Sequence, residues 1–327
     1  MSSIPYSRFV IGHIPWYSFL IVAGALAAIV LACREERRAG LPKDTVIDLA
    51  LFLLPGGIIG ARLYYVIFSW PQFQHDFLSV FRVWEGGLAI YGGIIGGLLV
   101  LLLFCRKRRL SALTLCDIIA PGLVLAQALG RWGNWFNIEA YGLTVTDPAL
   151  CFFPFAVQVP EDGYAWHMAT FFYESCWNLL VFVFLMVCRR KRLRARGDVF
   201  CFYLLLYAAG RLVIEEFRLD SLYASSSVRV SQLLSILLCV GVTARYALLL
   251  NRLGRLSAPL KYALLPLAAA VSVFALIFAL FGSFSASWPL YGTVLFLCGY
   301  SLIMIISLFL LHHAMPLPEV AHADDEA

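Results

Sequence analysis

A dense group of polar residues follows one of the long apolar stretches of this 327-residue chain. The segment Gly130–Gly142 contains Arg131, Asn134, Asn137 and Glu139. A charged side chain at the centre of a bilayer costs about 2.5–3.5 kcal/mol on insertion scales, so several polar residues at the end of an apolar run indicate a polar ligand. The alternative is that they only cap and solvate the end of a helix. A phospholipid headgroup is the ligand that this position favours.

A second charged pattern ends another apolar stretch. Tyr207, Arg211, Glu215 and Arg218 are spaced i, i+4, i+8 and i+11, which predicts that they share one helical face. Arginine suits a phosphate ligand because its planar guanidinium binds phosphate through two parallel hydrogen bonds and stays charged when partly desolvated. Glu215 would then hold Arg211 in orientation. The alternative is an ion pair between Arg211 and Glu215 that only helps the helices to pack.

The third pattern is rich in glycine. The segment Gly86–Gly97 includes Tyr91, Gly92 and Gly93. Glycines leave backbone amides accessible to a ligand, but they also let two helices pack closely, and the spacing alone favours packing slightly. Tyr91 adds a hydroxyl that can donate or accept a hydrogen bond.

Other polar residues in the apolar runs are isolated. For Arg62, Asp117 and Glu174, a salt bridge or hydrogen bond between helices explains the residue as well as a ligand does. Trp16 and Tyr17 are typical of aromatic anchors at a membrane interface.

The elements that must position these residues are membrane-spanning helices. The chain is 61% hydrophobic and 14% charged, whereas soluble domains carry about 25% charged residues. Since a bilayer crossing needs roughly 20 apolar residues, the sequence predicts nine spans, at about 16–33, 45–69, 88–105, 111–130, 168–188, 199–218, 231–250, 261–284 and 288–312. The fold class that follows is an all-α polytopic membrane protein.

The basic residues cluster in short loops between these spans, which is typical of loops on the cytoplasmic side. Nine spans then predict an extracytoplasmic N-terminus and a cytoplasmic C-terminus, and the loop clusters need no nucleic-acid partner to explain them. The first apolar run reads as a retained helix because no convincing cleavage site follows it. The nine cysteines show neither a metal-binding spacing nor a disulfide framework.

Three regions lie outside a plain bundle. Residues 70–87 are aromatic and amphipathic, which predicts a segment at the level of the headgroups. Residues 131–167 form the longest hydrophilic stretch and predict a small extracytoplasmic cap. Residues 256–312 hold two apolar spans without an acid or arginine, so we expect a membrane domain at 1–255 and an appended transmembrane hairpin with a polar tail at 256–327.

Together these blocks resemble the prolipoprotein diacylglyceryl transferase family. The family pattern G-R-x-G-N-F-x-N-x-E-x-x-G is matched from Gly130 to Gly142, with Trp135 in place of the usual Phe. Further blocks agree in order, and the similarity covers roughly residues 10–250: Trp16–Tyr17, Gly60–Tyr65, Pro71–Phe73, Arg82–Gly87, Asp117–Pro121, Tyr173–Glu174 and Tyr207–Arg218. The resemblance implies a seven-helix core, which leaves the last two spans outside it.

The resemblance implies an enzyme of the bacterial plasma membrane that carries out the first step of lipoprotein maturation. Such an enzyme moves the diacylglyceryl group of phosphatidylglycerol to the lipobox cysteine in a prolipoprotein signal peptide, forms a thioether and releases glycerol phosphate. Its partners are then membrane lipid and prolipoproteins, and the chemistry requires no metal or nucleotide cofactor.

The resemblance also implies roles for individual residues. Arg131 and Arg211 would clamp the phosphate, and Glu139 would accept the thiol proton or orient Arg131. The residues expected to hold or line the headgroup site are Tyr91, Asn134, Asn137, Tyr17, Tyr207, Gly92, Gly93 and Glu215.

One position departs from the family pattern. Many members have a histidine in an H-G-G motif where this chain has Tyr91, and that histidine has been considered a base for the thiol. Tyrosine has an unperturbed pKa of about 10 and is a poor base at neutral pH. Two other functions stay open: an inactive family member that acts as a membrane scaffold, and a lipid transporter that uses the same arginines as a pathway.

Overall fold

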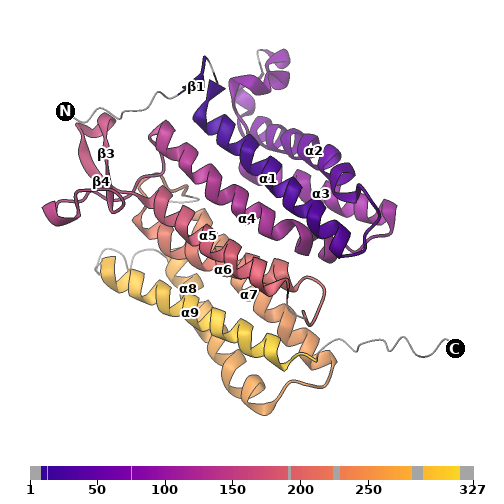
Figure 1. Cartoon of the computed structure of the whole chain (residues 1–327). Coiled ribbons are helices and arrows are strands. Elements are labelled where there is room, and N and C mark those ends of the chain that lie inside the picture. Colours follow the sequence, from indigo (N-terminus) through magenta and orange to yellow (C-terminus); the bar gives the residue numbers. More distant parts are fainter. Residues whose placement is uncertain are drawn as a thin grey trace. The chain divides into compact units, whose positions relative to one another are not determined.

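Long apolar helices account for most of the computed structural model, which describes residues 9–12, 14–74, 76–190, 193–223, 229–281 and 290–316. In chain order the helices are α1 (Trp16–Arg38), α2 (Thr45–Phe68), α3 (Ile90–Arg108), α4 (Ala112–Asn137), α5 (Thr170–Cys188), α6 (Asp198–Phe217), α7 (Val230–Arg252), α8 (Leu265–Phe281, preceded by a π-helical turn at Leu260–Leu264) and α9 (Leu290–Ala314) (Figure 1). Eight of these described helices are long and apolar enough to cross a membrane. The protein is therefore an all-α polytopic membrane protein, as its composition predicts.

Each predicted span coincides with one helix. Helix α6 is not among the eight because it carries Arg211, Glu215 and Glu216 close to its C-terminal end. The largest difference in a boundary concerns α4, which was predicted to end at residue 130 but continues to Asn137. Residues 131–137 of the predicted cap are therefore helical.

Packing explains why α4 continues through its polar residues. The indole of Trp132 donates a hydrogen bond to Ser175 on α5 at 3.1 Å. One turn further, Phe136 stacks on Trp16 of α1 with ring centroids 4.9 Å apart. The aromatic face of this last stretch is thus held on two sides, while Arg131, Asn134 and Asn137 occupy the rest of the helix surface.

The chain divides into two compact units. Unit 1 consists of residues 1–27 and 120–327, and unit 2 consists of residues 28–119. In unit 1, helices α5 to α9 lie side by side around α6 and α7 (Figure 1). Close packing of α5 on α6 requires glycine at position 210, because a Cβ atom there would lie 2.1 Å from the indole nitrogen of Trp177.

The appended spans belong to unit 1. Helix α8 packs on α7, and α9 packs on both α6 and α7. Their buried residues, such as Ala275, Tyr300 and Leu308, join the same apolar core as Leu205 and Ile236. A separate domain at 256–327 stays a prediction, and residues 317–327 of its tail lie outside the described residues.

Unit 2 is built on the close approach of α2 and α3. A Cβ atom on Gly92 would lie 2.3 Å from the carbonyl oxygen of Gly60, and one on Gly96 would lie 2.5 Å from that of Gly56. These glycines let the two backbones touch. Packing therefore accounts for Gly92, which the sequence also suggested as a binding residue; that binding role stays a prediction, as it does for Gly93.

Buried Arg62 in α2 organises the segment at 70–87. Its guanidinium donates hydrogen bonds to carbonyl oxygens of this segment, including those of Ser79 at 2.6 Å, Val80 at 2.8 Å and Gly86 at 2.6 Å. The segment forms three short 3-10 turns, at Trp70–Gln72, Phe77–Phe81 and Val83–Glu85. Arg62 thus satisfies backbone carbonyls. Its hydrogen bonds run to the segment at 70–87 and not, as the sequence suggested, to a neighbouring membrane-spanning helix.

Two small sheets were not predicted. Strands β1 (Phe9–Ile11) and β2 (Ile14–Pro15) pair ahead of α1, and β3 (Ala156–Val159) pairs antiparallel with β4 (Ala165–Met168). The second hairpin belongs to the region between α4 and α5. That region is tied to the end of α6, because the amide of Leu143 donates to the carbonyl of Phe217 at 3.0 Å.

Candidate active site

A single buried carboxylate, that of Glu174, lies within ion-pair distance of three arginines of unit 1. Glu174 lies in α5 with its side chain 3% exposed. Its Oε1 forms an ion pair with Nη2 of Arg131 at 2.5 Å. Its Oε2 forms an ion pair with Nη1 of Arg211 at 3.0 Å. Arg218, just after α6, approaches the same Oε2 at 3.7 Å. Two guanidinium groups from separate helices, α4 and α6, therefore converge on one point.

Arg211 is held from two sides. Besides Glu174, it pairs with Glu215 one helical turn further along α6, at 2.5 Å. Both carboxylates are almost fully buried, and Arg211 is 15% exposed. The ion pair between Arg211 and Glu215 that the spacing suggested is thus present, and it fixes one edge of the guanidinium. The role of Arg211 toward phosphate stays a prediction.

Arg131 is the more accessible of the two arginines. Its side chain is 22% exposed, and it hydrogen-bonds the hydroxyl of Tyr207, which lies one turn before Arg211 on α6. A guanidinium carries five N–H donors, so two partners leave donors for a third group. The arrangement can therefore accept an anion without first breaking the pair between Arg131 and Glu174.

The end of α4 folds back on itself around Glu139. The side-chain amides of Asn134 and Asn137 both donate to Oε1 of Glu139, at 2.9 and 3.2 Å. The turn needs a positive φ of 58° at both Ile138 and Ala140, a conformation that is uncommon for residues other than glycine. Glu139 itself is exposed. Three of the four polar residues of this segment thus form one group with the carboxylate at the surface, whereas the fourth, Arg131, pairs with Glu174.

Tyr17 lies against the same end of α4. A Cβ atom at position 133 would come within 2.7 Å of the Tyr17 ring, so glycine there lets α1 approach. The Tyr17 hydroxyl interacts electrostatically with both Glu139 and Arg131. Tyr17 therefore interacts with one residue of the asparagine–glutamate group and one of the arginine cluster.

The structure brings together eight of the predicted site residues, all in unit 1: Tyr17, Arg131, Asn134, Asn137, Glu139, Tyr207, Arg211 and Glu215. Tyr91, Gly92 and Gly93 belong to unit 2. Tyr91 lies in the first turn of α3, with its ring tilted against that of Tyr64 at a centroid distance of 6.5 Å. Its part in the site stays a prediction.

Sequence reasoning underrated Glu174. It was treated as one of several isolated polar residues, yet it is the residue on which the arginines meet. The signal was available: Glu174 is the one charged residue in the otherwise uncharged helix Thr170–Cys188. A lone acid in an apolar helix needs a cation from a neighbouring helix, and Arg131 and Arg211 were the arginines already singled out.

The part of the chain that contains these residues is similar in sequence to known proteins. The sequence profile of prolipoprotein diacylglyceryl transferase matches residues 7–248. This chain belongs to the prolipoprotein diacylglyceryl transferase family. Every residue of the arginine and asparagine–glutamate groups lies within the matched part, whereas α8 and α9 follow it.

Several bacterial relatives called phosphatidylglycerol–prolipoprotein diacylglyceryl transferase are similar over about two thirds of this chain. The Enterococcus faecalis protein is 46% identical over 229 residues, which cover 69% of this chain and 82% of the relative. The Halalkalibacterium halodurans protein is 45% identical over 234 residues, or 69% and 79%. The protein of Streptococcus equi subsp. equi is 46% identical over 228 residues, or 69% and 86%. Residues 249–327 of this chain lie beyond the part that the family profile matches.

Proposed function

We propose that this protein is a phosphatidylglycerol–prolipoprotein diacylglyceryl transferase. It takes the diacylglyceryl group of phosphatidylglycerol and attaches it to the lipobox cysteine in the signal peptide of a prolipoprotein. Family membership supports the reaction class, and the convergence of Arg131 and Arg211 on Glu174 is the observation that carries the mechanism. The reaction is the first step in the maturation of bacterial lipoproteins.

The chemistry is a displacement at an sp³ carbon of the lipid glycerol. The cysteine sulfur, as thiolate, forms a C–S bond, and the C–O bond to the phosphate breaks. The bonding electrons leave with the phosphate oxygen, so that glycerol phosphate is released and a thioether remains. Negative charge grows on the departing phosphate in the transition state, and donors that are already oriented there lower the barrier most.

Arg131 and Arg211 supply those donors in this proposal. Glu174 holds one edge of each guanidinium, at 2.5 and 3.0 Å, while the remaining N–H groups face the phosphate. A fixed fork binds a phosphate through two parallel hydrogen bonds. Because the ion pairs are already formed, little reorganisation is needed as the charge develops.

The group around Glu139 handles the glycerol headgroup and the proton. Asn134, Asn137 and Tyr17 offer hydrogen-bonding groups to the glycerol hydroxyls. A free thiol has a pKa of about 8.5 and must lose its proton to attack. Glu139 is exposed and lies near Tyr17, so it either accepts that proton or tunes Arg131 through Tyr17.

The proposed location is the bacterial plasma membrane, with the N-terminus outside the cytoplasm and the C-terminus inside. Helices α1, α3 and α7 each end in basic residues, and their C-terminal ends share one side in an alternating nine-span arrangement. Basic residues favour the cytoplasmic side. The arginine cluster, near the C-terminal ends of α4 and α6, then faces the outer leaflet.

The test is transfer of labelled diacylglyceryl from phosphatidylglycerol to a lipobox peptide by the purified full-length protein. Removing a single preorganised donor typically lowers turnover about 10²–10³-fold, so Arg131→Ala and Arg211→Ala should lose at least that much. Arg211→Lys should also be strongly impaired, because the ammonium group of lysine does not reproduce the two parallel N–H donors of the planar guanidinium. Arg108→Ala is a matched control, since Arg108 forms an exposed ion pair with Asp48 at 2.6 Å in unit 2.

Near-wild-type transfer by Arg131→Ala or Arg211→Ala would refute the clamp. Absence of transfer by the unmodified protein, together with failure to rescue a strain depleted of its own transferase, would refute the enzyme and favour a scaffold.

A further inference from the structure

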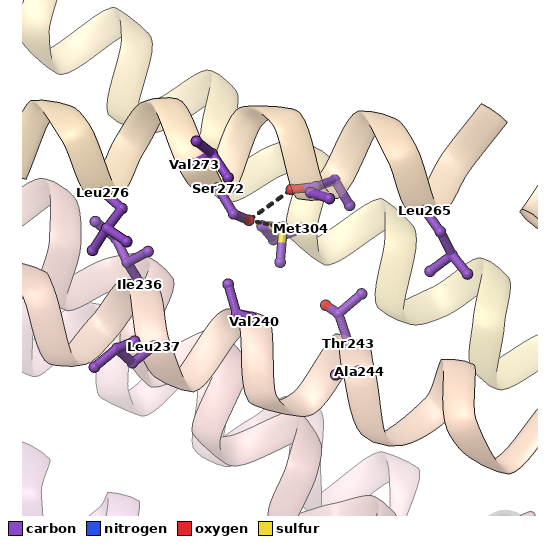
Figure 2. Close-up of a pocket in the computed structure, with 12 residues that line it drawn as sticks. Ile236, Leu237, Val240, Thr243, Ala244, Leu265, Ser272, Val273, Leu276 and Met304 are labelled. Atoms are coloured by element: carbon purple, nitrogen blue, oxygen red, sulfur yellow. Dashed lines mark hydrogen bonds between the residues drawn. The ribbon is translucent and has the colours of Figure 1, made fainter. Parts of the chain in front are cut away.

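A cavity opens in unit 1 where helices α8 and α9 meet α7. It has a volume of about 410 Å³ and is lined by residues of α7, α8 and α9, including Leu237, Val240, Ala269 and Met304 (Figure 2). Its walls are almost wholly apolar. Cavities of roughly 300–1,000 Å³ with apolar walls are the usual size for small-ligand sites.

The few polar groups in the cavity differ in how they are satisfied. The hydroxyl of Ser272 donates to the carbonyl of Ala268 in its own helix at 2.6 Å. Thr243 is buried, with 5% of its surface exposed, yet its hydroxyl has no hydrogen-bond partner among the described residues. Figure 2 shows Thr243 on the side of α7 that faces α8. A buried hydroxyl without a partner is unfavourable, so the cavity suits an occupant that brings an acceptor such as an ester oxygen.

Positive charge lies at one end of the cavity. Helix α7 runs past Ala244 to Arg252, and α8 reaches Leu265 one turn after Lys261. Arg252, Arg255 and Lys261 are exposed. The sequence contains no Asp or Glu between Asp220 and Glu319, and none of these three cations forms an ion pair with any described residue.

An apolar slot with cations at its end is complementary to an anionic phospholipid. We propose that this cavity holds one acyl chain of such a lipid, and that Arg252, Arg255 and Lys261 hold its phosphate. Basic residues at the membrane surface attract anionic lipids. An acyl chain alone would fill the slot without engaging the three cations at its end, and a soluble phosphate would engage the cations but leave the slot empty.

This site is distinct from the arginine–glutamate site. The N-terminal end of α7 lies near the latter, because Arg229 pairs with Glu216 of α6 at 2.5 Å. Arg252 is at the other end of α7, about 33 Å away at 1.5 Å per residue. Since α8 and α9 follow the region matched by the family profile, the lipid would be bound by the portion that this chain adds to the family core.

The experiment uses the purified full-length protein in nanodiscs that contain a phosphatidylglycerol with a photoreactive diazirine on one acyl chain. A parallel sample carries the same group on phosphatidylcholine. After illumination, labelled peptides are mapped by mass spectrometry. Ala269→Phe fills the cavity with a larger side chain, and Leu295→Phe, at an exposed position of α9 outside the cavity lining, is the matched control.

We expect phosphatidylglycerol to label the cavity-lining peptides of α7 and α8 more than phosphatidylcholine does. Ala269→Phe should abolish this excess and Leu295→Phe should retain it. Each of Arg252→Gln, Arg255→Gln and Lys261→Gln should weaken phosphatidylglycerol capture about fivefold without changing phosphatidylcholine capture.

Equal labelling by the two lipids would overturn the proposal, as would labelling unaffected by Ala269→Phe. If Ala269→Phe does not fold, the three glutamine variants, which lie at exposed positions, decide the question alone. A failure here leaves diacylglyceryl transfer by the arginine–glutamate site untouched, because that activity is measured separately.

Discussion

Helix α6 has a buried ionic cluster at each end. The two clusters differ in whether hydrogen-bonding groups remain available to a ligand. At the C-terminal end, Glu174 is shared by Arg131 and Arg211, at 2.5 and 3.0 Å. Arg131 remains partly exposed, and Glu139 nearby is open to solvent. The side chains of this cluster are held in place by ion pairs, but Arg131 still offers N–H donors. We call this the open cluster.

At the N-terminal end, Asp198 is fully buried, and its carboxylate is surrounded by protein groups. Its oxygens accept hydrogen bonds from the amides of Arg194 and Ala195, both at 2.8 Å. The hydroxyl of Tyr246 donates at 2.5 Å, and Nε2 of His312 lies 3.0 Å away. Four groups thus surround one carboxylate, and because Asp198 is fully buried, neither oxygen is open to a ligand from solvent. We call this the closed cluster.

The difference separates binding from structure within a single helix. Both clusters place a carboxylate in an apolar bundle, where an unsatisfied charge is costly. The open cluster keeps donors available at the surface and can stabilise an incoming charge. The closed cluster joins α6, α7 and α9, so it fastens the appended hairpin to the family core. Buried charge alone therefore does not mark the proposed site; the feature that separates the two clusters is the N–H donors that Arg131 keeps available.

The largest effect should come from removing the shared carboxylate. Glu174→Ala leaves Arg131 and Arg211 without their common anchor, so the two forks lose their orientation. We expect kcat for diacylglyceryl transfer to fall about 10²–10³-fold, with a smaller change in KM. The transfer assay measures both constants. Asp48→Ala, which removes an exposed partner of Arg108, is the control.

Glu174→Gln refines this result. Glutamine keeps the shape and one acceptor oxygen but loses the charge, so activity should fall between those of the alanine variant and the unmodified protein. If kcat were unchanged in both variants, Glu174 would be a packing residue and the open cluster would not depend on it.

A substitution in the closed cluster should lower the stability of the protein and leave its transferase activity unchanged. Asp198→Ala leaves two backbone amides, a tyrosine hydroxyl and a histidine without their acceptor. Breaking a buried ionic group by removing one partner costs about 3–5 kcal/mol, so the free energy of unfolding in detergent should drop by that amount. The folded fraction should retain its kcat. A variant as stable as the unmodified protein but inactive would reverse the assignment of the two clusters.

The sequence predicted the helices well and the clusters only in part. Apolar runs of about 20 residues are a strong signal because a bilayer leaves few alternatives, and all nine predicted spans match a helix. The end of α4 was missed because aromatic packing by Trp132 and Phe136, which depends on α5 and α1, extends the helix past Arg131. No local pattern carries that information.

Residue partners were harder to predict than residue types. The spacing of Arg211 and Glu215 predicted their ion pair because both lie on one helix. Glu174 meets its partners across three helices, and such contacts depend on how the bundle packs. Asp198 and His312 are 114 positions apart, and nothing in their local sequence links them.

A smaller loss of stability should follow from the hairpin side of the closed cluster. His312→Phe keeps an aromatic ring against Phe202, which now lies 5.0 Å from the histidine ring, but removes the contact with Asp198. Hydrogen bonds to charged groups contribute about 1.5–3 kcal/mol, so the unfolding free energy should fall by less than in Asp198→Ala. The same denaturation assay measures it. An effect as large as that of Asp198→Ala would mean that α9 packing, and not the shared carboxylate, holds the hairpin.

The smallest effect is expected at Tyr91, which belongs to unit 2. Tyr91→Phe removes a hydroxyl that is a poor base at neutral pH, so transfer should fall less than about tenfold, compared with the 10²–10⁴-fold contribution of a true general base. Glu139→Gln, measured in the same assay, should be the more impaired variant if Glu139 accepts the thiol proton. If Tyr91→Phe is the more impaired, proton transfer depends on a residue outside unit 1.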